Sequence, residues 1–168
     1  FGIITSAGLV RDLERWGERL GRPITESDIE PLNWAMAERG RSITANAYVA
    51  AVESVQSYAR GVAAWWEEGF DVLLTPTAAA QPAKIGELSP LGDPQTVMSG
   101  MMACTTFTIP FNATGQPAMS LPLHLGDEGL PVGIQLVAGY GREDVLVRLA
   151  SQLENARPWA SSLPAIHA

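Results

Sequence analysis

The chain contains few side chains that could act together as a nucleophile and a base. It has only two histidines, His124 and His167. In the alternating pattern around it, His124 shares a strand face with Ser120, so the two side chains could be neighbours in a minimal esterase. No Gly-x-Ser-x-Gly turn accompanies them, and His167 is the penultimate residue of an aperiodic tail. The favoured interpretation of both histidines is therefore structural.

The other reactive groups are equally isolated. Cys104, the single cysteine, lies on a methionine-rich segment without an adjacent histidine, and we expect a buried, unreactive thiol there. Adjacent carboxylates occur only where solvated positions are expected, at a helix end, a turn and a helix start: Glu67-Glu68, Asp127-Glu128 and Glu143-Asp144. The chain has no metal-ligand spacing, P-loop or GxGxxG motif, so we expect no metal and no cofactor. The residues themselves predict no self-contained catalytic site.

The composition limits the partners and the location. A net charge of −7 argues against nucleic acid, which needs clustered Lys and Arg. A single cysteine rules out an internal disulfide and favours a reducing cytoplasm. No apolar run approaches the roughly 18 residues of a membrane span, so no membrane association is expected. Hydrophobic residues make up 46% of the chain and charged residues only 17%. This predicts either an oligomer or a piece of a larger structure, and the start at Phe1 favours truncation.

Residues 1–69 are predicted to be helical. A stripe of apolar residues at helical spacing ends at Gly21: Leu9, Leu13, Trp16 and Leu20. Thr25 and Asp28 resemble a capping box that starts a second helix, ending at Gly40. Ser42 or Thr44 caps a third helix that reaches about Glu68. Its apolar stripe is long and wide, so this helix is expected to bury more than one face: Tyr48, Val52, Val55, Ala59, Val62 and Trp66.

After Gly69 the pattern changes to short strands and loops. Val72 to Leu74 is a short apolar run that fits a strand buried on both faces. Residues 75–94 form a proline-rich loop without periodicity, and Asp93-Pro94 reads as the N-cap and first residue of a helix. The apolar side of that helix includes Met98, Met101 and Met102, which suit either a core or a tolerant pocket wall.

The segment TFTIPFNATGQPAMSLPLHLGDEGLPVGIQLV, from Thr106 to Val137, combines a loop, two strands and an acidic turn. Alternation predicts strands at 118–125 and about 131–138, antiparallel to each other. Pro122 places the first strand at an edge or at a bulge. Gln135 lies on a buried strand and is expected to hydrogen-bond a neighbouring loop. A helix from Arg142 to Ala156 follows. The predicted fold is α/β, with a small mixed sheet from 70–75, 118–125 and 131–138.

Three motifs in this region resemble one known family. FTIPFNATGQPAMSLP at 107–122 and GLPVGIQLV at 129–137 are similar to the C-terminal block of the amidase signature family. FDVLLTPT at 70–77 resembles the strand and loop that precede that block, and the resemblance covers residues 70–159. The earlier helices look like the middle of bacterial amidases, in particular those resembling hydrolases of cyclic amide oligomers.

The resemblance implies amide hydrolysis by a Ser-Ser-Lys triad, in which one serine forms an acyl-enzyme, a second relays a proton and the lysine is the base. The family carries these residues in its N-terminal part. This sequence has no Gly-Ser-Ser run, and its one lysine, Lys84, lies in the proline-rich loop. No catalytic residue can be transferred.

What the resemblance does transfer is a supporting role. The loop matching Asn112 to Ala118, and the point matching Tyr140-Gly141, border the acyl or amine pocket in the family, where they can place the substrate. Asn112 also suits a plain turn residue, so its role stays open. The tentative substrate-pocket residues are Met101, Phe107, Asn112, Gln116 and Tyr140.

We therefore expect the C-terminal part of an amidase acting on a small-molecule amide, inactive alone. It should form one domain over 1–168, with a helical segment at 1–69, a core at 70–159 and a tail at 160–168. The alternative is a non-catalytic binding or assembly module with the same fold. Interior faces exposed in this chain predict self-association as a homo-oligomer.

Overall fold

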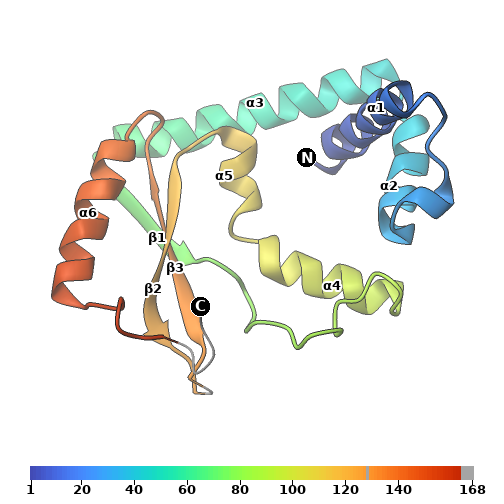
Figure 1. Ribbon diagram of the computed structural model, residues 1–168. Coiled ribbons are helices and arrows are strands. Elements are labelled where there is room, and N and C mark those ends of the chain that lie inside the picture. The colour runs from blue at the N-terminus through green and yellow to red at the C-terminus, as the bar shows by residue number, and fades with distance from the viewer. Residues whose placement is uncertain (128, 164–168) are drawn as a thin grey trace. The chain divides into compact units, whose positions relative to one another are not determined.

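The computed structural model describes residues 1–127 and 129–163, and it contains two compact units (Figure 1). The helical unit comprises Phe1–Tyr58 and Lys84–Ser99. The sheet unit comprises Ala59–Ala83 and the described residues from Gly100 onward. Two of the boundaries between the units fall inside continuous helices, after Tyr58 and after Ser99, and the third falls in a loop, after Ala83. None coincides with the division at residue 69 expected from the sequence. The single domain stays a prediction.

The helical unit contains helices α1 (Gly2–Leu20) and α2 (Pro31–Arg41). Gly21 ends α1 in the left-handed conformation (φ 68°), as predicted. The helices approach closely at Gly40, where an added Cβ would lie 2.2 Å from the Ser6 carbonyl oxygen. Both residues are buried, and so is Ala37. Small side chains therefore allow the two backbones to touch.

The predicted capping box is present, but it does not start α2. Thr25 and Asp28 cap a single 3-10 turn, Glu26–Asp28 (η1), and α2 begins three residues later with Pro31 in its first turn. Arg22 donates two hydrogen bonds of 2.8 Å to the Asp28 carboxylate, and the Thr25 N–H donates a third of 2.8 Å. These bonds hold the pKa of Asp28 well below its usual range, and the bonds from Arg22 have the largest effect. The turn between α1 and α2 is thus held by one ionised carboxylate.

Helix α3 (Ala45–Glu67) is long and continuous, and the Thr44 hydroxyl accepts a hydrogen bond of 3.1 Å from the Ala47 N–H at its start. No residue of α3 is buried, so the prediction that it buries more than one face is wrong for this chain. Helix α4 (Pro94–Thr105) starts as predicted from Asp93. The Asp93 carboxylate accepts a hydrogen bond of 2.8 Å from the Thr96 N–H, which lowers the pKa of Asp93.

The sheet contains β1 (Val72–Pro76), β2 (Ala118–Leu125) and β3 (Pro131–Ala138) in the order β1-β3-β2. The α/β class is confirmed, but both pairings are antiparallel, so the expected mixed sheet is wrong. Leu74 pairs with Leu136, whereas Leu121 pairs with Ile134. The expectation that β1 is buried on both faces is also wrong: β3 takes the central position, and Leu74 on the edge strand stays 62% exposed.

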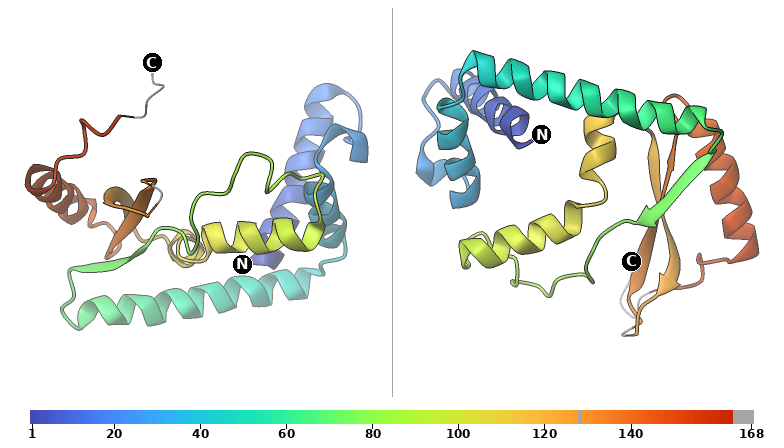
Figure 2. Two further views of the ribbon diagram at one scale, coloured as in Figure 1. Left: turned by 90° about the horizontal axis from the view of Figure 1, so that it is seen from below. Right: turned by 180° about the vertical axis from the view of Figure 1, so that it is seen from behind.

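Helix α6 (Glu143–Ala156) covers one face of this sheet, as Figures 1 and 2 show from opposite sides. Its Leu146 joins a buried cluster with Leu121, Leu136 and Ala138. The register of β2 against β3 shifts between Leu121 and His124, around Pro122. The predicted edge position and the predicted bulge are both present. The core of the sheet unit therefore forms between α6, β2 and β3.

Candidate functional site

The segment that joins α4 to β2 is helical where the sequence predicted a loop. Residues Ile109–Thr114 form α5, with Pro110 in its first turn. Gly115 ends it with φ 81°, and its N–H donates to the Phe111 carbonyl oxygen at 2.8 Å. Asn112 therefore lies on a helix, and the expectation of a loop beginning at this residue is wrong.

Gln135 on β3 holds the start of this segment. Its side chain is only 3% exposed, and its Nε2 donates to the Phe107 carbonyl oxygen at 2.8 Å and to Thr75 Oγ1 at 3.0 Å. The predicted hydrogen bond from Gln135 to a neighbouring loop is confirmed. One buried amide thus ties together β1, β3 and the segment before α5.

The proposed pocket residues lie on this segment and beside it. Phe107 is half-buried, whereas Asn112 on α5 is exposed. Gln116 is buried, and its Oε1 accepts a hydrogen bond from Thr114 Oγ1. The exposed Tyr140 reaches back across the segment, because one of its ring carbons lies 3.5 Å from where a Gly115 Cβ would be. The structure therefore brings Tyr140 against the turn that carries Gln116.

Met101 is exposed on α4, as are Met98 and Met102. Among the described residues these methionines are therefore not part of a buried core, and the pocket-wall alternative for α4 stays a prediction. The roles of Met101, Phe107, Asn112, Gln116 and Tyr140 in binding stay predictions.

A second polar contact lies beyond β1. Thr77 Oγ1 and Ser120 Oγ are 2.7 Å apart, and an added Cβ on Gly133 would lie 2.7 Å from the Ser120 oxygen and 2.8 Å from the Thr77 oxygen. Only glycine leaves room for this hydroxyl pair. Because Ser120 is bonded to Thr77 and His124 is exposed, the structure gives no support to a Ser120-His124 esterase.

Thr77 also lines a cavity of about 420 Å³ in the sheet unit, together with Gln81, Cys104, Val132, Gly133 and several alanines and prolines. Cys104 is exposed, so the expected buried thiol is wrong. It lies on the side of α4 that lines this cavity. None of the five proposed pocket residues lines the cavity.

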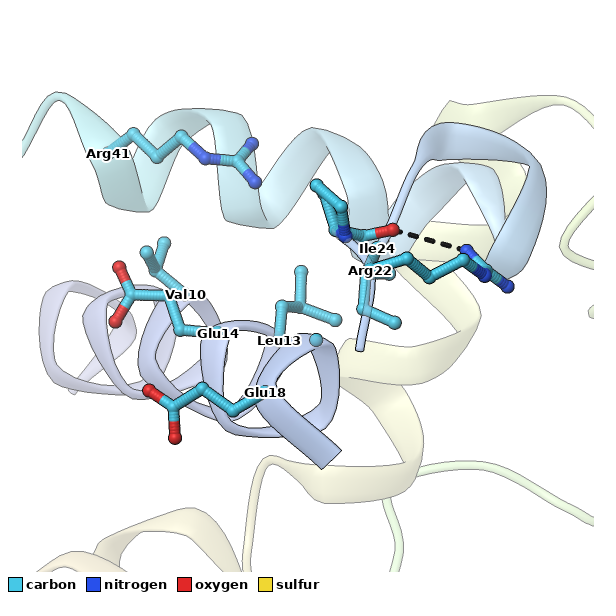
Figure 3. Close-up of a pocket in the computed structure, with 9 residues that line it drawn as sticks. Val10, Leu13, Glu14, Glu18, Arg22, Ile24 and Arg41 are labelled. Carbon is cyan, nitrogen blue, oxygen red and sulfur yellow. Dashed lines mark hydrogen bonds between the residues drawn. The ribbon is translucent and has the colours of Figure 1, made fainter. Parts of the chain in front are cut away.

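A cavity of about 440 Å³ lies in the helical unit, between α1, α2 and the turn that follows α1 (Figure 3). Its floor is apolar, with Val10 and Leu13, and Arg22 at its edge donates to the Pro23 carbonyl oxygen at 3.1 Å. Glu14 and Glu18 both lie within 3.5 Å of the Arg11 guanidinium. Paired carboxylates of this kind suit a solvated helix surface better than acid-base chemistry.

Metal ligands, membrane-spanning helices and the lone lysine add no further candidate site among the described residues. Residues 1–127 and 129–163 contain no group of three or more His, Cys, Asp or Glu side chains arranged to bind a metal ion. Over the same ranges, no helix is both long and apolar enough to cross a membrane. Lys84 is exposed in the loop before α4. Two residues considered from the sequence, Glu128 and His167, lie outside the described residues.

Comparison with known proteins identifies similar chains. A family model described as Amidase matches residues 6–147. A 6-aminohexanoate-cyclic-dimer hydrolase from Paenarthrobacter ureafaciens is 42% identical over 98% of this chain and 34% of its own length. A hydrolase of the same name from Pseudomonas sp. (strain NK87) is also 42% identical, over 96% of this chain and 34% of its own length.

A solved structure of 6-aminohexanoate cyclic dimer hydrolase complexed with substrate matches 94% of this chain and 34% of its own, with a TM-score of 0.87 and 43% identity. The chain therefore spans about a third of the length of the curated relatives it matches.

Proposed function

The chain belongs to the amidase family, and from this premise we propose that it forms the C-terminal part of an enzyme that hydrolyses a small-molecule amide. The observation that carries the proposal is the match of nearly the whole chain to 6-aminohexanoate-cyclic-dimer hydrolases at 42% identity. Identity at this level over a complete segment extends to the α4-α5 region and to the β2-β3 hairpin. The proposed substrate class is a short aliphatic amide, cyclic or linear.

In this proposal the Ser-Ser-Lys triad lies outside residues 1–168. The chemistry of the chain supports this arrangement, because Ser120 is bonded to Thr77 and the lone lysine, Lys84, is exposed in a loop. Acyl transfer needs a nucleophile and a base within hydrogen-bonding reach of each other. The chain alone is therefore proposed to be inactive, and it needs neither metal nor cofactor.

The contribution of this chain is to place the substrate. The segment from Phe107 to Gln116 is held by Gln135 at one end and by the left-handed Gly115 at the other, with Tyr140 against it. A wall anchored in this way would lower the entropy cost of aligning an amide carbonyl with a nucleophile. Phe107 and Met101 supply apolar surface, whereas Asn112 and Gln116 supply polar groups. A cytoplasmic location is part of the proposal, because the single cysteine suits a reducing compartment.

A chimera tests the proposal. The matched third of the hydrolase from Paenarthrobacter ureafaciens is replaced by this chain, and hydrolysis of one amide bond of the 6-aminohexanoate cyclic dimer to the linear dimer is measured. We expect the chimera to hydrolyse the amide and the 168-residue chain alone to show no activity. A matched pair of variants in the chimera, Tyr140→Phe and Tyr140→Ala, separates the loss of a hydroxyl from the loss of the ring over Gly115.

Each outcome decides between the candidates. Hydrolysis by the chain alone would contradict the position of the triad. A chimera that folds and binds the cyclic dimer but does not hydrolyse it would favour the binding module. A folded chimera that neither binds nor hydrolyses the dimer, or any other short amide tried, would refute the substrate class.

A further inference from the structure

We propose that the cavity between α1 and α2 binds a short linear ω-amino acid, an aliphatic chain with an ammonium group at one end and a carboxylate at the other. The cavity lies wholly within the helical unit. Its volume of about 440 Å³ falls in the range of about 300–1,000 Å³ that is usual for small-molecule sites. None of the five proposed substrate-pocket residues lines it, so it is a separate site.

The cavity combines an apolar floor with opposite charges on its two sides. Val10 and Leu13 of α1 supply the floor. Figure 3 shows the Arg41 side chain along α2, while the carboxylates of Glu14 and Glu18 project from α1 on the other side. Methylene groups suit the floor, an ammonium suits the two carboxylates, and a carboxylate suits the guanidinium. A ligand that matches all three features is charged at both ends and apolar between them.

The α1 side of the cavity has an excess of negative charge. Glu14 Oε2 lies 3.2 Å and Glu18 Oε1 lies 3.5 Å from the same atom, Arg11 Nη1. The two carboxylates therefore share one guanidinium, and the three groups together carry one net negative charge. A carboxylate has several acceptor positions, so each can keep its contact with Arg11 and also accept a hydrogen bond from an ammonium. This side can bind a cation without breaking an ion pair.

On the α2 side, Arg41 is held in place before any ligand binds. Its guanidinium carbon lies 4.9 Å from the centroid of the Trp34 ring, and its Nη1 donates a hydrogen bond to Glu38. A guanidinium has several N–H donors, so those not used by Glu38 can bind a ligand carboxylate. Because the side chain is already ordered, binding costs less conformational entropy than it would for a free arginine.

The second arginine of the cavity is committed to the turn. Arg22 donates to both carboxylate oxygens of Asp28 and to the Pro23 carbonyl oxygen, so the carboxylate end of the ligand is assigned to Arg41. Hydrolytic opening of a cyclic amide produces a chain with an ammonium and a carboxylate at its ends. Under the proposed function the ligand therefore has the chemistry of a product, but binding itself does not depend on that function and can be measured without catalysis.

An NMR titration of the ¹⁵N-labelled 168-residue chain tests the proposal, with 6-aminohexanoate as the probe at neutral pH, where both of its ends are charged. We expect saturable shifts in the amide signals of residues 10–24 and 38–41. The dissociation constant should be millimolar, because exposed ion pairs contribute little. Hexanoate and hexylammonium have the same number of carbon atoms but one charged end each, and both should bind about two- to fivefold more weakly.

Two substitutions assign the ends of the ligand. Arg41→Gln should weaken binding of 6-aminohexanoate about two- to fivefold and leave hexylammonium unaffected, whereas Glu18→Gln should weaken it by a similar factor and leave hexanoate unaffected. Arg39→Gln and Glu26→Gln are the matched controls, because both residues are exposed and neither lines the cavity. The controls should bind all three compounds as the unchanged chain does.

Four results would overturn the proposal. The first is the absence of saturable shifts around the cavity, and the second is equal affinity for the three six-carbon compounds. The third is an equal loss in the controls, which would indicate a general effect of charge. The fourth comes from calorimetry on the chimera: if Arg41→Gln did not weaken binding there, the rest of the amidase fold would cover the cavity. A chimera that binds the probe through Arg41 but does not hydrolyse the cyclic dimer would support this site and count against the proposed function alone.

Discussion

Strand β3 and helix α3 are both apolar, but only one of them is buried. The last four residues of β3, Gln135–Ala138, are all buried, and Val137 and Ala138 have no exposed surface. In α3 no residue is buried. The strand is covered by β1, β2 and α6 within one unit, whereas the side chains of α3 are at most partly covered. Apolar composition therefore predicts a need for burial, and the local chain decides whether that need is met.

The largest expected difference between the two regions concerns apolar truncation. Leu136→Ala removes a side chain that is 1% exposed, so we expect it to lower the free energy of unfolding by about 2–5 kcal/mol. Val55→Ala in α3 should change it by less than about 0.5 kcal/mol, because the Val55 side chain is only partly covered and alanine favours a helix. Urea titrations of the 168-residue chain measure both. Equal losses would mean that α3 is already packed in solution.

A smaller effect is expected from Gln135, the buried polar side chain of β3. Gln135→Leu removes the donor to the Phe107 carbonyl oxygen, and leaving that acceptor unpaired should cost about 1–3 kcal/mol. Thr75→Val is the matched control: it removes the second bond of the same amide and keeps the bond to Phe107. The control should therefore cost less in the same titration. In the chimera, Gln135→Leu should raise the KM for the cyclic dimer more than it lowers kcat, because the segment bearing Phe107 loosens.

The cap of α3 gives a local effect of about 1 kcal/mol. Thr44→Ala removes the hydroxyl that accepts the Ala47 N–H bond, and the first turn of the helix should fray. A helix stabilised mainly by its own bonds should show this as faster amide exchange at its N-terminus, with the sheet unaffected. Thr44→Ser keeps the hydroxyl and is the control. If Thr44→Ala instead speeded amide exchange throughout the chain, including the sheet, α3 and the sheet would unfold together.

The smallest effect involves the charged turn of the helical unit, where solvent weakens the contribution of the exposed ion pair between Arg22 and Asp28. The pKa of Asp28 is lowered in the folded state, so the stability that its bonds contribute is fully present above 3.8, its ordinary value, and declines as the pH falls from there toward the lowered pKa. Circular dichroism between about pH 7 and pH 2 should show a modest loss of helix at the acid end. Asp28→Asn should be slightly less stable at neutral pH and less sensitive to acid.

The elements that the sequence predicts well are the ones whose partners are close in the chain. The β2-β3 hairpin follows from alternation and an acidic turn, and the bulge follows from Pro122. Helix α6 follows from its apolar stripe and from Glu143 and Asp144 in its first turn. The bond from Gln135 was predictable as well, because a buried amide must find a partner.

The missed features depend on distant or very short segments. The antiparallel pairing of β1 cannot be predicted from the residues around it, because its partner strand lies about 60 residues away in the sequence. Helix α5 has six residues, too few to show a period. The exposure of Cys104 was missed because neighbouring methionines indicate a core only when something covers the helix. For the pocket residues, the sequence indicates a region but not the atoms that would touch a substrate.

The bond between Thr75 and Gln135 spans 60 residues, and this has a consequence for synthesis on the ribosome. At about 5–20 residues per second, β1 emerges roughly 3–12 s before the strand that pairs with it. During that interval the edge of β1 and the apolar side of Leu74 are available to other chains. The proline-rich loop after β1 offers no β-strand of its own to fill the gap. Nascent chains stalled in this window should be the forms most in need of a chaperone.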